Sequence, residues 1–386
     1  MIGLCINYNN HNYGGLLQAY ATTIVLDKLN LEYEIIRYKK KESMFAIIKS
    51  IPRLLNIVLI NDKKENLLKK IGLLLHKDFR RNNDIREQKF DYFIKSKFKK
   101  LSPVFVGYDN LCCQAKQRYS CVISGSDQLW SPAGLPTNFY NLMFCDKQAL
   151  KISYASSFGV SYIPWYQKSR TKAYLEKIDF ISMRESKGAD LVYQLTNRVV
   201  PVVLDPVFLL SYDEWNALIP TPKKIMEKYV FVYFLGKAEH YIDSINKFAK
   251  CNNLKIVVLK HLDQYDKKID SFGDYSPYDV DPEDFLNIIK NAEYIFTDSF
   301  HGSAFSILFK KQFLTFNRYS SNSKASKNSR VDTLLKTFDI LDRRYNGNIN
   351  FVKEDINYET INGILKTRQK ESFDFLSKSL NKKSLI

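Results

Sequence analysis

The stretch Tyr294-Ile-Phe-Thr-Asp-Ser-Phe-His-Gly-Ser-Ala-Phe-Ser-Ile-Leu308 decides how the rest of the chain is interpreted. Residues 294–296 are a short apolar run with the length and composition of a buried strand. Residues 304–309 have the composition of a helix. Residues 297–303 are therefore predicted to form the turn between strand and helix, with His301 at the helix start.

This turn has the composition of an anion site. The first turn of a helix offers unpaired backbone N–H groups and the positive end of the helix dipole. The hydroxyls of Thr297, Ser299 and Ser303 add further donors. His301 could give a proton to a group attached to the bound anion. In the alternative, Ser299 is an ordinary N-cap and His301 a packing residue, and the stretch alone favours neither.

Strands and helices alternate on both sides of this stretch. In the second half, strands are predicted at 229–235, 255–260, 294–296 and 313–316, and in the first half at 2–6, 34–38, 121–124, 151–159, 180–186 and 199–210. Two such units predict an α/β protein with two Rossmann-like domains in a GT-B-like arrangement. The predicted domains are residues 1–215 and 216–355, followed by a C-terminal helical segment, 356–386. The basic, helical stretch 39–100 interrupts the first unit and is predicted to be an insertion.

Polar turns follow two strands of the first domain. Gly14 and Gly15 begin a helix and would let the backbone approach a ligand, while Asn12 and Gln18 could hold hydroxyl-rich groups. The turn lacks the GxGxxG pattern, and no acidic residue closes the second strand, so a dinucleotide site is discounted. A helix-start turn without a ligand is the alternative. The second turn lies beyond a strand end, where open α/β sheets bind ligands, and contains Gly125, Ser126, Asp127 and Gln128.

Two groups of basic residues are further candidates. Arg184 lies at the end of the predicted strand 180–186 and suits bidentate binding of a carboxylate or phosphate, although a structural pair with Glu185 is an alternative. The loop 318–330 carries Lys324, Lys327 and Arg330. This loop either closes over a substrate or is only solvated.

Composition limits the classes of protein that fit. The 386 residues carry a formal net charge of +17, which favours anionic partners, yet the basic runs are short and lack the aromatic interleaving of nucleic-acid modules. A solvated basic surface and contact with an anionic membrane both remain open. No apolar run reaches the roughly 18 residues of a membrane span, and the six cysteines have no zinc-ligand spacing. We therefore expect a cytoplasmic protein without a metal and without nucleic-acid partners.

Five motifs occur together in one order. They are Asn12-Tyr-Gly-Gly-Leu-Leu-Gln-Ala-Tyr-Ala21, Ser124-Gly-Ser-Asp-Gln-Leu-Trp-Ser-Pro132, Ser182-Met-Arg-Glu-Ser186, Leu204-Asp-Pro-Val-Phe-Leu-Leu210 and Thr297-Asp-Ser-Phe-His-Gly302. From near residue 1 to about residue 340, the chain resembles the polysaccharide pyruvyl transferase family. The resemblance implies a two-domain GT-B-like fold. It also implies transfer of a pyruvyl group from phosphoenolpyruvate to two hydroxyls of a sugar, with release of phosphate. The product would be a cyclic pyruvate ketal on a precursor of a capsule, an exopolysaccharide or a wall polymer.

The resemblance also implies roles for the candidate residues. His301 resembles the family's general acid and Arg184 its donor-binding arginine, so the two should face one another within about 12 Å across a cleft. No cofactor is implied. Asp127 is either a base for the attacking hydroxyl or a structural cap. The donor side would comprise Ser299, Phe300, Gly302, Ser303, Lys324, Lys327 and Arg330, and the acceptor side Asn12, Gly14, Gly15, Gln18, Ser126, Asp127 and Gln128.

The expected partners are phosphoenolpyruvate and a sugar acceptor, and whether that acceptor is lipid-linked stays open. Peripheral contact with the inner face of an anionic membrane is the corresponding option for location. Two rival hypotheses are a GT-B glycosyltransferase that uses a nucleotide sugar and a non-catalytic binder of anionic polymer.

Overall fold

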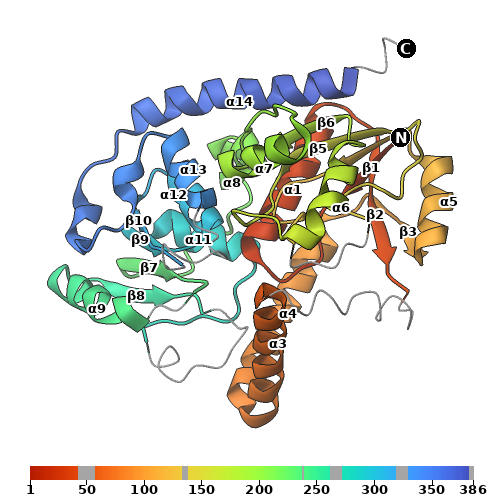
Figure 1. The fold of residues 1–386 in the computed structure, drawn as a ribbon. Helices are drawn as coiled ribbons and strands as arrows, with labels where there is room; N and C mark the ends of the chain where they lie inside the picture. The colour runs from red at the N-terminus through yellow and green to blue at the C-terminus, as the bar shows by residue number, and fades with distance from the viewer. Residues whose placement is uncertain (42–56, 133–137, 237–238, 261–271, 319–328, 382–386) are drawn as a thin grey trace.

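The first half of the chain forms a six-stranded parallel sheet. The computed structural model describes residues 1–41, 57–132, 138–236, 239–260, 272–318 and 329–381, without the side chains of 57–63 and 65. The strand order is β3-β2-β1-β4-β5-β6, which is the order of a Rossmann sheet (Figure 1). The strands are β1 (Ile2–Cys5), β2 (Tyr33–Lys39), β3 (Leu101–Val106), β4 (Cys121–Ser124), β5 (Leu150–Ser156) and β6 (Phe180–Met183).

Helices cover both faces of this sheet. Since a parallel sheet is buried on both sides, its strands are apolar almost throughout, and β1 and β4 are buried at every residue. The helices that follow the strands are α1 (Tyr13–Lys28), α5 (Tyr108–Arg118), α6 (Trp165–Leu175), α7 (Ser186–Thr196) and α8 (Tyr212–Asn216).

The second half forms a four-stranded parallel sheet with the order β10-β9-β7-β8. Its strands are β7 (Tyr229–Tyr233), β8 (Lys255–Val258), β9 (Tyr294–Thr297) and β10 (Gln312–Thr315). Its helices are η3 (Glu239–Tyr241), α9 (Ile242–Cys251), α11 (Pro282–Asn291), α12 (Phe300–Leu308) and α13 (Ser329–Thr337), followed by η4 (Leu341–Arg343) and η5 (Ile349–Lys353). The prediction of two Rossmann-like units is confirmed, whereas the exact domain limits stay a prediction.

Two local predictions were wrong. Helix α12 begins at Phe300 rather than at residue 304, because Ser299 caps it by accepting a hydrogen bond from the backbone N–H of Gly302. The last strand predicted at 199–210 is absent from the described structure apart from one bridge between Met183 and Val202. Residues 206–209 instead form the 3-10 helix η2 (Pro206–Leu209), capped by the Asp205 carboxylate. Pro206 suits this position because it lacks the N–H that a strand would use.

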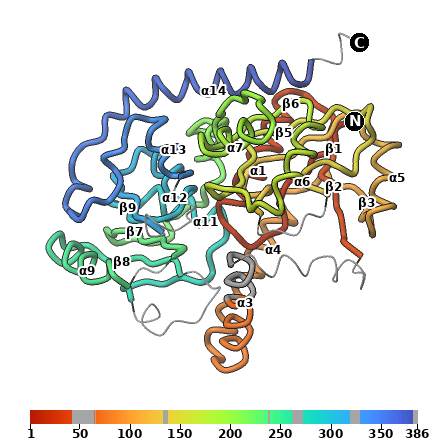
Figure 2. Tube along the Cα trace, in the orientation of Figure 1, coloured from red at the N-terminus to blue at the C-terminus, as the bar shows by residue number. Residues whose placement is uncertain are grey.

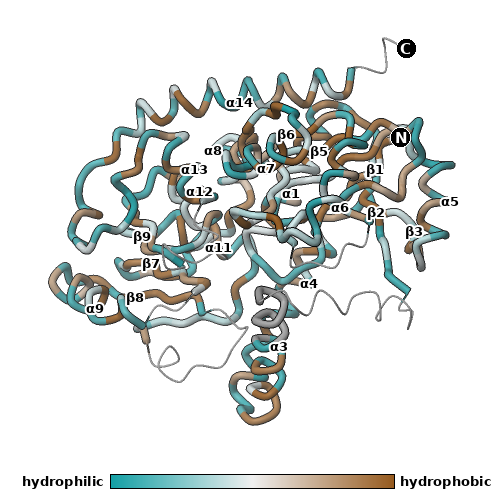
Figure 3. The backbone as a smooth tube through the Cα atoms, viewed as in Figure 1, coloured by the Kyte–Doolittle hydropathy of each residue, from teal (hydrophilic) through white to brown (hydrophobic). Residues whose placement is uncertain are grey.

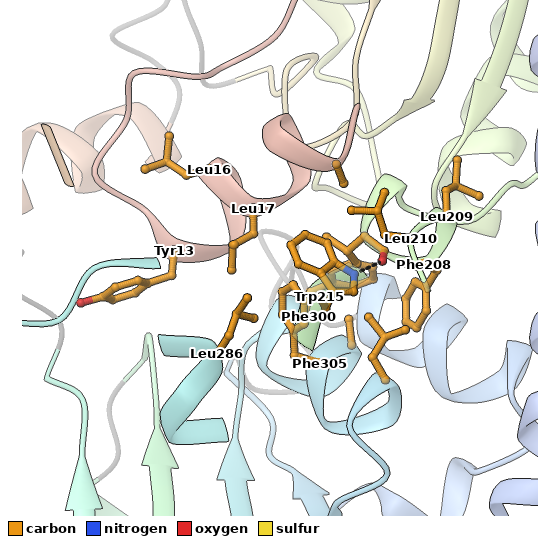
Figure 4. Packing of buried hydrophobic residues seen from close by; sticks show 14 of the residues in the cluster. Tyr13, Leu16, Leu17, Phe208, Leu209, Leu210, Trp215, Leu286, Phe300 and Phe305 are labelled. Atoms are coloured by element: carbon orange, nitrogen blue, oxygen red, sulfur yellow. Dashed lines mark hydrogen bonds between the residues drawn. The ribbon is translucent and has the colours of Figure 1, made fainter. Parts of the chain in front are cut away.

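One hydrophobic core joins the two sheets. Helix α1 of the first domain packs against α11 and α12 of the second and against η2. The indole of Trp215 lies between the rings of Tyr20 and Phe305, and its Nε1 donates to the carbonyl of Val207 at 2.9 Å (Figure 4). The domains therefore share buried apolar surface as well as a site.

The C-terminal helix α14 (Tyr358–Asn381) runs along both domains (Figures 1 and 2). At its start, the hydroxyl of Tyr358 donates to the carbonyl of Lys311 in the second domain. Further along, Gln369 Nε2 donates to the carbonyl of Phe208 at 2.6 Å, and Ser372 Oγ accepts from the N–H of Leu204 at 3.1 Å. The predicted helical C-terminus is confirmed, and it fastens the two halves together.

The insertion contains a helical hairpin, α3 (Ile57–Leu75) and α4 (Lys77–Lys97), which projects from the body (Figure 1). The predicted insertion 39–100 also includes residues 42–56, which lie outside the described residues. In the part of the chain that can be described, none of the helices combines the length and the apolar character that crossing a membrane requires.

Candidate active site

The first turns of two helices meet between the domains. Helix α1 follows β1 and is capped by Asn12, whose Oδ1 accepts from the N–H of Gly15 at 2.9 Å. Helix α12 follows β9 and carries His301 in its first turn. A Cβ atom placed on Gly14 would lie only 2.1 Å from His301 Nδ1. Only glycine at position 14 therefore lets the imidazole lie directly against the backbone of α1.

His301 is buried beside a carboxylate of the other domain. Its Nε2 lies 3.7 Å from Asp205 Oδ2, an ion-pair distance that is too long for a hydrogen bond. Among the described residues this nitrogen has no hydrogen-bond partner. The ring also meets the edge of Phe300, with centroids 5.1 Å apart.

The carboxylate of Asp205 contacts side chains from several parts of the site. Its Oδ2 accepts from Arg184 Nη1 at 2.8 Å and from Ser126 Oγ at 2.9 Å, while Oδ1 accepts from the N–H of Val207 at 3.1 Å. Burial acts to raise the pKa of this carboxyl, but the facing imidazole of His301 and the guanidinium of Arg184 lower the pKa well below its usual range. Asp205 is therefore a charged carboxylate that orients the candidate acid and the candidate anion binder together.

The predicted pair of Arg184 and His301 is thus brought together, since both contact the same oxygen. The Arg184 side chain is only 1% exposed and lies over the ring of Phe300, 4.5 Å from its centroid. Burial acts to lower the pKa of Arg184, but the carboxylates of Asp205, Asp127 and Glu185 raise it. Within the described chain, its Nε and Nη2 have no hydrogen-bond partner. The pair with Glu185 weighed from sequence is present as an ion pair of 4.0 Å between Nε and Oε2, a distance too long for a hydrogen bond.

A second arginine lies in the same place. Arg330, in the first turn of α13, donates from Nη1 to Gln128 Oε1 at 3.0 Å when the amide is in the orientation that satisfies both groups. Burial, and then the nearby charge of Arg184, lowers the pKa of Arg330 to about 10. Its Nε has no hydrogen-bond partner among the residues described. Two buried guanidinium groups that are close enough to repel one another form a strong candidate anion-binding site.

Two other carboxyl groups flank the arginines. Burial raises the pKa of Glu185, whose Oε1 accepts from Ser157 Oγ at 2.8 Å. Asp127 Oδ1 lies 3.5 Å from Arg184 Nη2, and its side chain is 19% exposed, the most open of the three carboxylates. Asp127 also has a φ of 78°, a conformation that is costly outside glycine and that recurs at functional sites.

Several residues that were predicted to bind a substrate make hydrogen bonds within the protein. The hydroxyl of Thr297 donates to the carbonyl of Tyr233, and that of Ser303 to the carbonyl of Ser299. Gln18 is fully buried, and its Nε2 donates to the carbonyl of Gly15 at 3.0 Å. Ser126 holds Asp205. Contacts of these residues with a substrate stay predictions, and Lys324 and Lys327 lie outside the described residues.

Sequence reasoning missed the role of Asp205. Asp205 was visible as the only charged residue of the motif Leu204-Asp-Pro-Val-Phe-Leu-Leu210. A lone carboxylate in an apolar stretch indicates a buried partner of opposite charge. The identity of that partner was not readable, because Arg184 and His301 are distant in the sequence.

The protein has two parallel sheets with helices, and the site lies where strands end and helices begin. This architecture is that of the GT-B fold. The UDP-GlcNAc 2-epimerase from Neisseria meningitidis, solved bound to UDP-GlcNAc, is similar over 97% of this chain and 100% of its own, with 11% identity and a TM-score of 0.50. Another UDP-N-acetylglucosamine 2-epimerase is similar over 100% of this chain and 96% of its own, with 10% identity and a TM-score of 0.52. At such identities these likenesses show the fold alone.

The family is shown by the sequence. The model of the family described as polysaccharide pyruvyl transferase matches residues 12–321. The chain therefore belongs to that family and is a transferase, as its motifs indicated. A search of curated proteins found no match.

Proposed function

We propose that the protein transfers the pyruvyl group of phosphoenolpyruvate onto two hydroxyls of one sugar, forming a pyruvate ketal in surface polysaccharide biosynthesis. Membership of the family supports the transfer of a pyruvyl group. The observation that carries the proposal is the convergence of Arg184 and His301 on Asp205, with Arg330 beside them. That arrangement combines an anion-binding site, formed by the two arginines, with a candidate acid, His301.

Phosphoenolpyruvate fits the arginine pair because it carries both a carboxylate and a phosphate. Guanidinium groups bind such anions with two parallel hydrogen bonds. Nε and Nη2 of Arg184 form one edge of that kind, and Nε of Arg330 adds a further buried donor.

The chemistry needs one proton donor at carbon. His301 Nε2–H protonates the methylene carbon of the enol, so that the neighbouring carbon becomes an oxocarbenium-like centre. One sugar hydroxyl adds to this centre. The bond to phosphate then breaks, and the second hydroxyl closes the ketal ring and gives its proton to the departing phosphate. The charged carboxylate of Asp205 lies 3.7 Å from the same nitrogen.

The acceptor would lie on the side of the first domain. Asp127 is the carboxylate with the greatest exposure in the cluster, so it could take the proton of the attacking hydroxyl, with Asn12 and Gln128 nearby in the same strand-end loops. A lipid-linked sugar at the inner face of a membrane suits the net charge of +17.

The test is phosphate release from phosphoenolpyruvate, screened across lipid-linked and free sugars. His301→Ala should lower turnover by roughly 10²-fold or more while the circular dichroism spectrum is unchanged, and the exposed His240→Ala serves as the matched control. Hexose transfer from a sugar nucleotide, without phosphate release, would show a glycosyltransferase instead. Polymer binding that survives in His301→Ala, with no turnover in either form, would show a binding protein.

A further inference from the structure

The projecting hairpin carries an apolar face that nothing in the described structure covers. Leu67, Ile71, Leu74 and Leu75 of α3 are 59%, 42%, 79% and 71% exposed. Their spacing of four, seven and eight residues places them on one side of the helix, within a sector of roughly 100°. Gly72 is buried, and α3 packs against α4, with Lys69 Nζ on that side 3.9 Å from Glu87 Oε1 of α4. The exposed face is therefore the one turned away from the protein.

The hairpin is held as an arm rather than folded against the body. At its base, Arg86 of α4 donates to the carbonyls of Lys260 and Pro277 in the second domain, at 2.6 and 2.9 Å. Phe90 and Phe93 are buried in the main core. The other end projects beyond both domains (Figure 1), and hydrophobic and hydrophilic residues are mixed along it (Figure 3).

Basic side chains surround the apolar face. Residues 64–81 contain six basic and two acidic residues, and exposed cations of this segment include Lys64, Lys70, Lys77, Arg80 and Arg81. Lys64 lies one turn before Leu67 on the same side. A lysine there can lay its stem on apolar surface and extend its ammonium to a headgroup.

We infer that the outer end of this hairpin docks the protein onto an anionic lipid surface. An apolar sector ringed by lysine and arginine is the pattern of a helix that lies in the plane of a membrane interface. Two occupants of this face are a second copy of the chain and an anionic membrane. The basic residues favour the membrane, because a second copy would bring a second set of like charges to the contact, whereas anionic headgroups would neutralise the charges.

Docking would also place the site beside the membrane. Asn83, Arg86 and Phe90 of α4 line a cavity together with Asn12 and Tyr233, which belong to the loop and strand that lead to the candidate active site. This part of the inference rests on the proposed function, since it would present the site to a lipid-linked acceptor. The docking itself does not depend on any activity.

The experiment is co-sedimentation of the full chain with vesicles, which needs no turnover. Wild type should bind vesicles of phosphatidylglycerol mixed with phosphatidylcholine, and bind those of phosphatidylcholine alone far more weakly. The triple variant Ile71→Gln, Leu74→Gln, Leu75→Gln should lose roughly tenfold or more of this binding. Val199→Gln with Leu341→Gln, exposed apolar residues elsewhere, is the matched control and should bind as wild type does.

A second pair tests the charges separately. Lys70→Gln with Lys77→Gln should weaken binding and its dependence on salt, while the exposed Lys366→Gln with Lys370→Gln should not. Equal vesicle binding by wild type and the triple variant would overturn the inference. So would a dimer, seen by light scattering, that the triple variant dissociates and that does not bind vesicles.

Discussion

At the scale of single residues, the closest contact in the site is between Gly14 and His301. A methyl group at position 14 would lie within 2.6 Å of three His301 atoms, so the ring must move. At Gly15 the nearest atom is the end of the Asn10 side chain, at 2.8 Å, which can move more easily. Gly14 therefore leaves space for the imidazole of His301, whereas Gly15 leaves space for the side chain of Asn10.

We expect Gly14→Ala to lower turnover by roughly 10²-fold, because it displaces the candidate acid from Asp205. Gly15→Ala should lower turnover less, because the Asn10 side chain that it meets can move, and it serves as the comparison. The measurement is phosphate release at saturating phosphoenolpyruvate, with thermal unfolding to show that both variants fold. Equal losses in the two variants would mean that the helix start, rather than the imidazole, is what the glycines protect.

Glu185 makes stability depend on pH. Its folded pKa is raised, so its contribution to stability is fully present below the unfolded pKa of about 4.3 and is lost as pH rises through the folded pKa. Glutamine has the same shape and cannot ionise. Glu185→Gln should therefore match wild type near pH 4 and be more stable than wild type at neutral pH.

Denaturant unfolding across this pH range measures the effect. Glu176→Gln, at an exposed i,i+4 pair with Lys172, is the control and should show no such trend. A difference between Glu185→Gln and wild type that stays constant with pH would rule out this account of the carboxyl.

At the scale of elements, helix α4 fastens the domains through Arg86. This buried side chain donates to carbonyls of Lys260, Pro277 and Tyr278, all in the second domain. Arg86→Met keeps the apolar stem but leaves these carbonyls without the charged donor. Because hydrogen bonds to charged groups contribute about 1.5–3 kcal/mol, the free energy of unfolding should fall by about 3 kcal/mol.

Chemical denaturation of Arg86→Met and of the exposed Arg80→Met on the same helix tests this role. The control should change stability by less than about 0.5 kcal/mol. Equal stability of the two variants would show that the hairpin only rests on the second domain.

At the scale of the whole molecule, the shared core predicts that the two domains unfold together. Trp215 is fully buried and packs against Phe305 of the second domain (Figure 4), and its ring also contacts Tyr20 of the first domain. Trp215→Ala should lower the free energy of unfolding by about 3–5 kcal/mol. Calorimetry should show a single transition in wild type and variant, and Trp165→Ala, at an 83% exposed residue, should leave it unchanged. Two well-separated transitions in wild type would contradict a common core.

Local patterns predicted most elements of this molecule well. The strand predicted at 294–296 is observed as β9 at Tyr294–Thr297, because a short apolar run is a strong signal for a buried strand. The start of α12 was predicted too late, since Gly302 has low helix propensity and the effect of the Ser299 cap was underrated. The strand expected at 199–210 failed because its apolar residues serve the core between the domains rather than a sheet.

The sequence by itself determined the two α/β units, the helix start beneath His301 and the basic character of the chain. These follow from period, composition and capping, which act over a few residues. Only the tertiary structure decided that Asp205 joins Arg184 to His301, that the hydroxyl of Thr297 donates to Tyr233, and that α3 leaves an apolar face exposed. The physical reason is that ion pairing and burial depend on which distant segments pack together, and that packing is set by the contact between the two domains.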